Sequence, residues 1–487
     1  MPYFTPLTPA DRVRAAIGMV IVLFSVIILV GTRETLLGDP DIWWHIKTGD
    51  WIWLNGQFPT VDPFSYTFAG QPWIAKEWLA QLVYAAAYAM GGWNAVSLLA
   101  VLAVAASVAL LYRYVSVDLR PNLAGSVVIV CLLLACPTFV VRPHLLTLPL
   151  VILWTHELFK SSLQGRAPSY MLLVAMLAWA NLHAAFTIGF VIAFFAFLDF
   201  LETTRLTKKD QLIKWIVFLA LCPAVTLIHP YGYKAMMTTL LVFRSEEGNI
   251  PLNEWQPFNA QTSMLYSIAL LGLVFAAITS GFRLGFARAL LVMLLTYQFL
   301  SHMRYAFYLF PVMTLVVVPA LARQFPRLSG QRWMEQPLDA VERRASQFFR
   351  PVGAVLTAVL LAALGLQLWV LKTSPPEHIA ATAAIDYVKS HGVSGNVLNY
   401  YDFGGPLIFH GIPTFIDGRT DQLFTNGFQK QVSTVPTDSQ TLSNTLAKYD
   451  VRWTMLPPDS PFAKLLDKLP GWKRIFTDKS AVIHQRE

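Results

Sequence analysis

The sequence predicts an α-helical polytopic membrane protein with a small α/β domain towards its C-terminal end. Of the 487 residues, 55% are hydrophobic and only 14% are charged, whereas a soluble globular protein carries about 25% charged residues. The apolar residues form long runs, such as 15–30 and 95–111. From about residue 373 the chain becomes more polar, and short strand-like and helical pieces alternate there.

Eleven apolar runs predict about 11 transmembrane helices, because a helix of roughly 17–25 residues crosses a bilayer. They lie at about 15–33, 94–113, 123–140, 145–159, 170–183, 185–201, 214–229, 263–280, 289–302, 305–322 and 352–371. The segment Trp78–Met90 is apolar but short, so we expect an interfacial or partly inserted helix there. The first run is expected to be an uncleaved span, since no small-residue cleavage site stands out after it.

The basic residues of the loops predict the orientation of these helices. With Trp78–Met90 at the interface, eighteen Lys and Arg residues fall on one side, and seven fall on the other before the C-terminal region. The richer side is expected to be cytoplasmic, which puts the N-terminus inside and the C-terminal domain outside. This orientation accounts for the formal charge of +8 better than a nucleic-acid partner does.

The predicted organisation has a transmembrane domain over 1–372, with a first outer loop at 34–93, and an outer α/β domain over 373–487. Residues 323–351 are expected to form a basic cytoplasmic linker, with Arg343 and Arg344 against anionic headgroups. In the outer domain we expect strands at 396–400, 413–417 and 452–456, and helices near 377–391 and 440–449. The three cysteines lie in apolar runs, so no disulfide framework is expected.

Polar motifs gather at predicted helix ends on the outer side. Ionisable groups near a bilayer are costly, and are tolerated where they face a cavity or one another. Any one of these motifs alone is explained by a helix cap or a lipid anchor, but their common side predicts one outward-facing polar cavity. They are Asp39/Asp41/His45, Lys76-Glu77-Trp78, Arg142-Pro143-His144, Asn181-Leu182-His183, His229-Pro230-Tyr231-Gly232, Glu254-Trp255-Gln256 and His302-Met303-Arg304.

The chemistry of the set is complementary. Partly desolvated carboxylates suit proton transfer, and Asp39, Asp41 and Glu77 are the candidates for a base. Cations bind and stabilise a phosphate leaving group, a role for which Arg142, Arg304, His144 and His302 are the candidates. The Asp39-Pro40-Asp41 triplet is compatible with Mg²⁺ or Mn²⁺ but does not require either ion. No Walker loop, dinucleotide glycine pattern, nucleophile elbow or His-x-x-x-His zinc pair occurs.

Together these motifs resemble the GT-C fold membrane glycosyltransferases. More narrowly, the chain is similar to a group of bacterial membrane proteins with the motifs Asp-x-Trp-Trp-His, Asp-Pro-Phe-Ser-Tyr-Thr and Glu-Trp-Leu. Here these motifs lie at 41–45, 62–67 and 77–79. Further segments that fit the same pattern are 142–144, 179–183, 254–257, 302–304, 401–405 and 415–421.

The resemblance implies transfer of a sugar from a polyprenyl-phosphate donor, with inversion, to an extracytoplasmic glycan, lipid or protein acceptor. It also implies a bacterial inner membrane location and a catalytic base in the first outer loop. The family pattern fits Asp41 better than Asp39, because Asp41 directly precedes the aromatic residues. Candidates for substrate contacts are Trp43, Trp44, His45, His183, His229, Glu254, Asp417 and Arg419.

Several readings remain open. Trp43 and Trp44 also suit anchoring at the membrane interface, and Asp417 and Arg419 also suit an ion pair that fixes a turn. A membrane transporter or a scaffold subunit of an envelope polysaccharide system is the main non-enzymatic alternative. Ligation of a preformed glycan from undecaprenyl diphosphate is a second enzymatic one.

Overall fold

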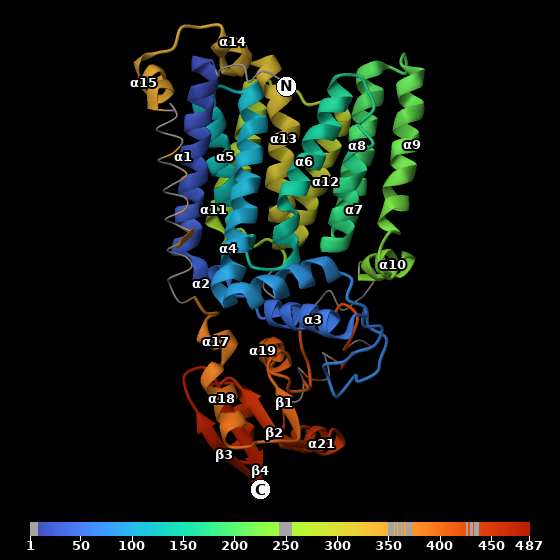
Figure 1. Ribbon diagram of the computed structural model, residues 1–487, viewed down its shortest axis with the longest axis vertical. Coiled ribbons are helices and arrows are strands. Elements are labelled where there is room, and N and C mark those ends of the chain that lie inside the picture. Colours follow the sequence, from blue (N-terminus) through green and yellow to red (C-terminus); the bar gives the residue numbers. More distant parts are fainter. Residues whose placement is uncertain are drawn as a thin grey trace.

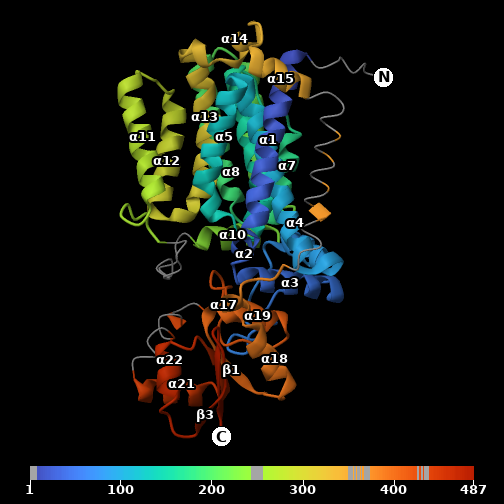
Figure 2. The same ribbon diagram turned by 90° about the vertical axis from the view of Figure 1, so that its left-hand side faces the viewer.

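The computed structural model describes residues 8–242, 256–348, 373–424 and 438–487, and the single positions 355, 358, 362, 365, 366, 427, 428 and 432. The molecule is elongated, with a bundle of long helices at one end and a small sheet with helices at the other (Figures 1 and 2). The helices α2 (Arg33–Leu36) and α3 (Asp41–Asn55) lie between these two parts.

The bundle helices follow the predicted apolar runs closely. They are α1 (Pro9–Gly31), α4 (Trp78–Asp118), α5 (Pro121–Ala135), α6 (Pro143–Leu163), α7 (Leu172–Leu182), α8 (Phe186–Thr204), α9 (Lys209–Thr226), α11 (Met264–Ser280), α12 (Phe286–Ser301) and α13 (Ala306–Gln324). The short helix α10 (Tyr233–Val242) matches no predicted run and lies across the end of the bundle (Figure 1). Five helical segments of the described chain are long and apolar enough to span a membrane. The predicted number of 11 spans is therefore not confirmed, and most of the last predicted run, 352–371, lies outside the described residues.

Helix α4 changes direction after its first thirteen residues. Its backbone is not helical at Gly91 (φ −165°) and Gly92 (φ +60°), and a positive φ is a conformation that glycine adopts without strain. The light-blue segment before this break runs across the end of the bundle, and the segment after it runs along the bundle (Figure 1). This geometry agrees with the separate short helix predicted at Trp78–Met90.

Helix α3 starts and stops at identifiable signals. Before it, Oδ1 of Asp39 accepts a hydrogen bond from the backbone N–H of Asp41 (2.9 Å), and such a bond satisfies an N–H group that a helix start leaves without a partner. The helix ends at Gly56 in the left-handed conformation (φ +62°). Between these signals it buries Ile42, Trp43, Trp44, His45 and Ile46 among others, so most of its N-terminal half is packed on both sides.

The outer domain is built on a four-stranded sheet of order β1-β2-β4-β3. β1 (Asn396–Asn399) pairs in parallel with β2 (Val451–Leu456), while β4 (Val482–Arg486) pairs antiparallel with both β2 and β3 (Trp472–Thr477). The predicted strand at 413–417 is wrong, because Thr414 forms only an isolated bridge, to Ser65. The helices of this region are α17 (Glu377–Ala380), α18 (Thr382–Ser390), α19 (Gly404–Phe409), α21 (Ser439–Lys448) and α22 (Pro461–Leu466).

The outer domain and the first outer loop share a core. Trp44 and Trp73 of the loop cluster with Phe415, Ile416 and Phe424 of the outer domain. The backbone N–H of Tyr66 donates to Thr414 O (3.1 Å), and the hydroxyl of Thr67 donates to Phe415 O (2.7 Å). The segment 414–424 therefore packs against the first outer loop, although it follows the predicted domain boundary at 373.

The opposite end of the bundle carries the predicted basic linker. It contains α14 (Gly330–Met334) and α15 (Ala340–Phe348), both near the start of α1 (Figure 1). Trp333 packs with Ala10 and Val13 of α1, and the Arg14 guanidinium lies 5.7 Å from the Trp333 ring. The linker is thus anchored to the first helix through an aromatic contact and a cation–π contact.

Candidate functional site

One guanidinium joins the two aspartates that open the first outer loop. Nε of Arg142 lies 2.7 Å from Oδ2 of Asp39, and Nη2 lies 2.7 Å from Oδ2 of Asp41. Arg142 directly precedes α6, and its carbonyl accepts a hydrogen bond from the Tyr84 hydroxyl (2.9 Å). The side chains of all three ionic partners are only 11–16% exposed, a setting in which charge-assisted contacts are strong.

A second acidic centre forms around Glu77, the residue just before α4. Oε1 of Glu77 lies 3.3 Å from Nε2 of His183, and Oε2 lies 3.8 Å from Nε2 of His45. The backbone N–H of Ala184 also donates to Oε1 (3.5 Å). Three segments that are distant in the sequence therefore place nitrogen atoms around one carboxyl group.

Hydrogen bonds assign the tautomer of both histidines in this centre. The backbone N–H of Ala185 donates to Nδ1 of His183 (3.2 Å), so the proton of the neutral ring is on Nε2 and faces Glu77. The side-chain amide of Gln81 lies 3.3 Å from Nδ1 of His45 and gives it the same tautomer. Both rings therefore carry their proton on Nε2, the nitrogen that lies 3.3 Å (His183) or 3.8 Å (His45) from the Glu77 carboxyl group.

Burial sets the protonation of this centre near neutral pH. It raises the pKa of Glu77 from 4.5 to about 7, against a lowering by the charge of Lys76. Burial also lowers the pKa values of His45 and His183 well below 6.5, and Arg142 near His45 and His144 near His183 lower them further. The centre thus combines two neutral imidazoles with a carboxyl group that titrates near pH 7.

The outer domain closes this region from the other side. Lys76 forms an ion pair with Asp421. Burial alone would lower the pKa of Lys76, but the Asp421 carboxylate raises it. Gly418 lies so close to Asp41 that a Cβ atom at position 418 would overlap Oδ1 of Asp41. A Cβ atom at Gly405 would overlap the carbonyl oxygen of Pro40, so the two backbones approach closely there.

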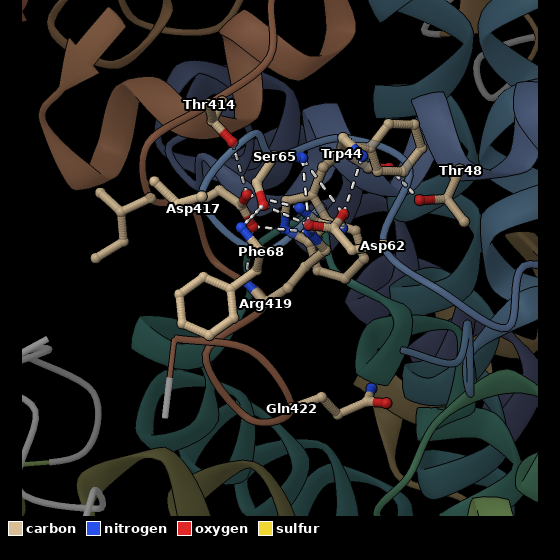
Figure 3. Close-up of polar contacts among 12 residues, drawn as sticks. Trp44, Thr48, Asp62, Ser65, Phe68, Thr414, Asp417, Arg419 and Gln422 are labelled. Atoms are coloured by element: carbon tan, nitrogen blue, oxygen red, sulfur yellow. Dashed lines mark hydrogen bonds and ion pairs between the residues drawn. The ribbon is translucent and has the colours of Figure 1, made fainter. Parts of the chain in front are cut away.

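Asp417 and Arg419 form a buried network with the first outer loop (Figure 3). Nε and Nη2 of Arg419 each lie 2.8 Å from a carboxylate oxygen of Asp417, and Nη1 pairs with Asp62. The side chains of Asp62, Asp417 and Arg419 are all 0% exposed. This burial favours the turn-fixing, structural role that the sequence left open, and a substrate contact of Asp417 and Arg419 stays a prediction.

His229 also has a structural position. Its Nε2 donates to the carbonyl of Lys76 (3.0 Å), and its Nδ1 accepts from the backbone N–H of Tyr231 (3.2 Å). The Tyr231 hydroxyl donates to the carbonyl of Pro59 (2.8 Å). The loop at 229–231 therefore holds both ends of the segment 59–76, which leads directly into Glu77.

The other predicted cationic residues lie around the same end of the bundle. Nε2 of His144 donates to Thr138 O (3.2 Å), and the His144 ring lies 5.9 Å from the His183 ring. His302 ends α12, and Arg304 follows it in a 3-10 turn at Met303–Tyr305. The charge of Arg304 acts on both Lys76 and His183, which places it beside the Glu77 centre.

The two tryptophans of the first motif are buried between the parts of the molecule. The Trp43 ring lies 4.4 Å from the ring of Trp93 and 5.0 Å from that of Phe409, and Trp44 stacks 3.7 Å from His45. Both are less than 9% exposed, so they act as packing residues in this structure. Glu254 lies outside the described residues.

No metal-binding cluster is found in the described part of the chain, where no three His, Cys, Asp or Glu side chains are grouped to hold an ion. Asp39 and Asp41 instead share Arg142. The compatibility of these two aspartates with Mg²⁺ or Mn²⁺ stays a prediction.

Comparison with known proteins gives structural likenesses only. No protein-family model matches the chain, and no curated protein matches it. The apo crystal structure of the oligosaccharyltransferase from Archaeoglobus fulgidus is similar over 90% of this chain and 69% of that chain, with a TM-score of 0.44 and 12% identity. ArnT from Cupriavidus metallidurans, bound to undecaprenyl phosphate, is similar over 97% of both chains, with a TM-score of 0.49 and 12% identity.

Sequence reasoning missed several residues of the site. Lys76 was identified only as part of the motif at 76–78, whereas it pairs with Asp421, 345 positions away. Asp62 was identified only as the start of the motif at 62–67, although it pairs with Arg419, and Gln81 was not identified, although it orients His45. The spacing of Glu77 and Gln81 by one helical turn was the available signal for Gln81.

Proposed function

We propose that this protein is a membrane glycosyltransferase that moves a sugar from a polyprenyl-phosphate donor to an acceptor outside the cytoplasm. The transfer inverts the anomeric carbon, and an acidic residue of the first outer loop acts as the base. The observation that carries this proposal is the shared position of Arg142, Asp39, Asp41 and Glu77 at one end of an apolar helix bundle. Cations and bases that meet at the end of a bundle suit a substrate with an anionic head and an apolar tail.

Arg142 is the residue proposed to hold the donor phosphate. A guanidinium presents several N–H donors in one plane and matches the oxygens of a phosphate. Its two partners in this structure are carboxylates, whose oxygens face the guanidinium as the oxygens of a phosphate would. Lys76, His144, His302 and Arg304 supply further positive charge or N–H donors around it and stabilise the departing lipid phosphate.

An apolar groove next to this region supports a lipid-linked donor. It is an open groove with a cavity volume of about 50 Å³, and its lining is almost wholly apolar. Its wall includes Cys136 of the 3-10 turn Cys136–Thr138, and the carbonyl of Thr138 in that turn accepts the His144 hydrogen bond. A chain in the groove would thus end near the segment that carries Arg142. Other lining residues are Phe24, Ile28, Leu29, Ile129, Leu132 and Phe139.

The transporter alternative gains less support from the same observations. A substrate path across the bundle calls for polar groups at mid-depth. The described polar groups of the site gather instead at the end of the bundle that faces α3 and the outer domain. An enzyme that works at the membrane surface fits this distribution better than a transporter or a scaffold does.

A binding experiment tests the proposal. The full chain in lipid nanodiscs is titrated with undecaprenyl phosphate, and the change in thermal stability reports binding. Arg142→Ala should weaken binding about tenfold or more, because a hydrogen bond to a charged group is worth about 1.5–3 kcal/mol. Arg113→Ala, an exposed arginine near the other end of α4, is the matched control and should bind as the wild type does. Equal affinity of the Arg142→Ala variant and the wild type contradicts the proposal.

The second half of the test measures transfer. Radiolabelled polyprenyl-phosphate sugars are offered to the nanodisc protein together with membrane glycans, lipids and peptides. Release of free polyprenyl phosphate with label in an acceptor is the expected result. Binding without any transfer across this panel favours the scaffold alternative.

A further inference from the structure

We infer that Glu77 is the residue that takes the acceptor proton, and that Asp39 and Asp41 position Arg142. This inference rests on the proposed function and divides its acidic residues into two roles. It also departs from the sequence expectation, in which Asp41 is the base.

The contacts of Asp39 and Asp41 favour the positioning role. Asp39 uses one oxygen to accept the N–H that starts α3 and the other to pair with Arg142. Asp41 pairs with the same guanidinium through Oδ2, and its Oδ1 lies against Gly418. A carboxylate stabilised by a close guanidinium is a weaker base. The two aspartates therefore fix the direction of Arg142, and both carboxylates are engaged by its guanidinium.

The contacts of Glu77 favour proton transfer. Nε2 of His183 and Nε2 of His45 lie 3.3 Å and 3.8 Å from its carboxylate oxygens, and both rings are neutral, with their proton on Nε2. The adjacent Lys76 ammonium turns to Asp421 and pairs with that residue. Glu77 thus accepts from the Ala184 N–H and faces two neutral rings, and among the described residues no Lys or Arg forms an ion pair with it. His183 is a positioning residue in this arrangement, because a backbone N–H fixes its tautomer.

The electrostatic surroundings of Glu77 support this role. Three charged side chains influence the Glu77 carboxyl group electrostatically: Lys76, Arg142 and Asp421. The rings of His45 and His183 face it. The hydroxyls of Tyr84 in α4 and Tyr308 in α13 also interact with its charge. Burial dominates and raises the pKa of Glu77 to about 7. A general base works best when its pKa lies near the working pH.

The proposed step balances without any further reactant. The acceptor hydroxyl oxygen forms a bond to the anomeric carbon while the bond from that carbon to the phosphate oxygen breaks. The electron pair of the broken bond stays on the polyprenyl phosphate beside Arg142. The hydroxyl proton moves to the Glu77 carboxylate and then to water.

The test compares four variants in the transfer assay across pH 5 to 9. Because Glu77 must be ionised, kcat of the wild type should rise with pH up to about 7 and then level off. Glu77→Gln should lose about 100-fold or more in kcat on the plateau above pH 7 and should not show the rise, and Glu77→Asp should keep part of the rate. Asp41→Asn should raise KM for the donor about tenfold and keep the rise near pH 7.

Asp421→Asn gives a readout that a purely structural role of Glu77 does not move. The Asp421 charge raises the pKa of Glu77, so its removal should shift the rise in kcat to lower pH. This result is expected even if Glu77→Gln fails to fold.

The outcomes separate the two proposals. Absence of both lipid-phosphate binding and transfer in the wild type overturns the proposed function and this inference together. Two results overturn the inference alone and make Asp41 the base. The first is a transfer rate in Glu77→Gln that stays within tenfold of the wild type. The second is a rise in kcat with pH that is abolished by Asp41→Asn and is not shifted by Asp421→Asn.

Discussion

Gly418 of the outer domain and Asp41 of α3 are in direct contact, and the Asp41 carboxylate occupies the space that a side chain at position 418 would fill. The indole nitrogen of Trp44 borders the same space. This contact joins a turn near the C-terminal end to the first helix of the outer loop. The orientation of the acidic residues before α3 therefore depends on residues more than 370 positions away.

The Gly418 contact predicts a strong effect of a single methyl group. Gly418→Ala should displace Asp41 or the turn and destabilise the protein by about 1–3 kcal/mol, the usual cost of overpacking. It should also weaken binding of undecaprenyl phosphate, because Arg142 loses a well-placed partner. Gly272→Ala in α11, where an added Cβ atom meets no neighbour within 4 Å, is the control. Similar melting temperatures for the two variants would show that the site tolerates the shift.

The Arg419 network predicts that the outer domain and the first outer loop unfold together. Arg419→Met leaves the buried carboxylates of Asp62 and Asp417 without their cation, and breaking such a pair costs about 3–5 kcal/mol. The exposed pair between Arg452 and Asp450, with side chains 53% and 64% exposed, serves as the control. Arg452→Met should cost less than about 1 kcal/mol. Thermal unfolding in detergent measures both, and an equal cost would disprove the structural role of Arg419.

Loss of the Lys76 charge is expected to shift the pH profile of kcat to higher pH. Its charge lowers the pKa of Glu77, so Lys76→Met removes a stabilising influence on the Glu77 carboxylate. The pH at which kcat reaches half of its plateau should therefore rise. The measurement is the pH profile of sugar transfer, with Lys234→Met in α10 as a control for loss of a lysine elsewhere. A downward shift in the Lys76 variant contradicts the assignment of that titration to Glu77.

Glu77 also predicts how stability depends on pH, independently of activity. Its pKa is raised in the folded protein, from 4.5 to about 7, so the folded state binds this proton more tightly than the unfolded chain does. The resulting stability is present below pH 4.5 and is lost as the pH rises towards 7. The melting temperature should thus fall between pH 5 and pH 8 in the wild type, and fall less in Glu77→Gln. Glu335→Gln, an exposed glutamate at the end of α14, should behave as the wild type.

Much of the site follows from the sequence because helix ends can be located from apolar runs. Asp39, Asp41, Glu77, Arg142 and His183 all lie next to helix ends, and the loop charges predict that these ends share one side. The prediction of one polar region therefore depends only on hydropathy and charge. It does not depend on knowing which helices are neighbours.

The roles within that region were not predictable in the same way. Asp417 and Arg419 carry the charges of a binding site, and only their complete burial with Asp62 favours a structural role. Trp43 and Trp44 are of the residue type that anchors helices at membrane interfaces, yet they pack against Trp93, Phe409 and His45. Side-chain chemistry is the same in both settings, and burial by distant residues makes the difference.

The sequence by itself determined the membrane-type helices, the polar character of the last hundred or so residues and the side on which the ionisable motifs gather. These features follow from local composition, since the free energy of placing a segment in a bilayer depends mainly on its own residues. The tertiary structure alone decided that Asp39 and Asp41 share Arg142, that Lys76 pairs with Asp421 and that Glu77 faces two neutral histidines. Those pairings depend on distances between segments remote in the sequence, and electrostatic energies and pKa values follow distance and burial.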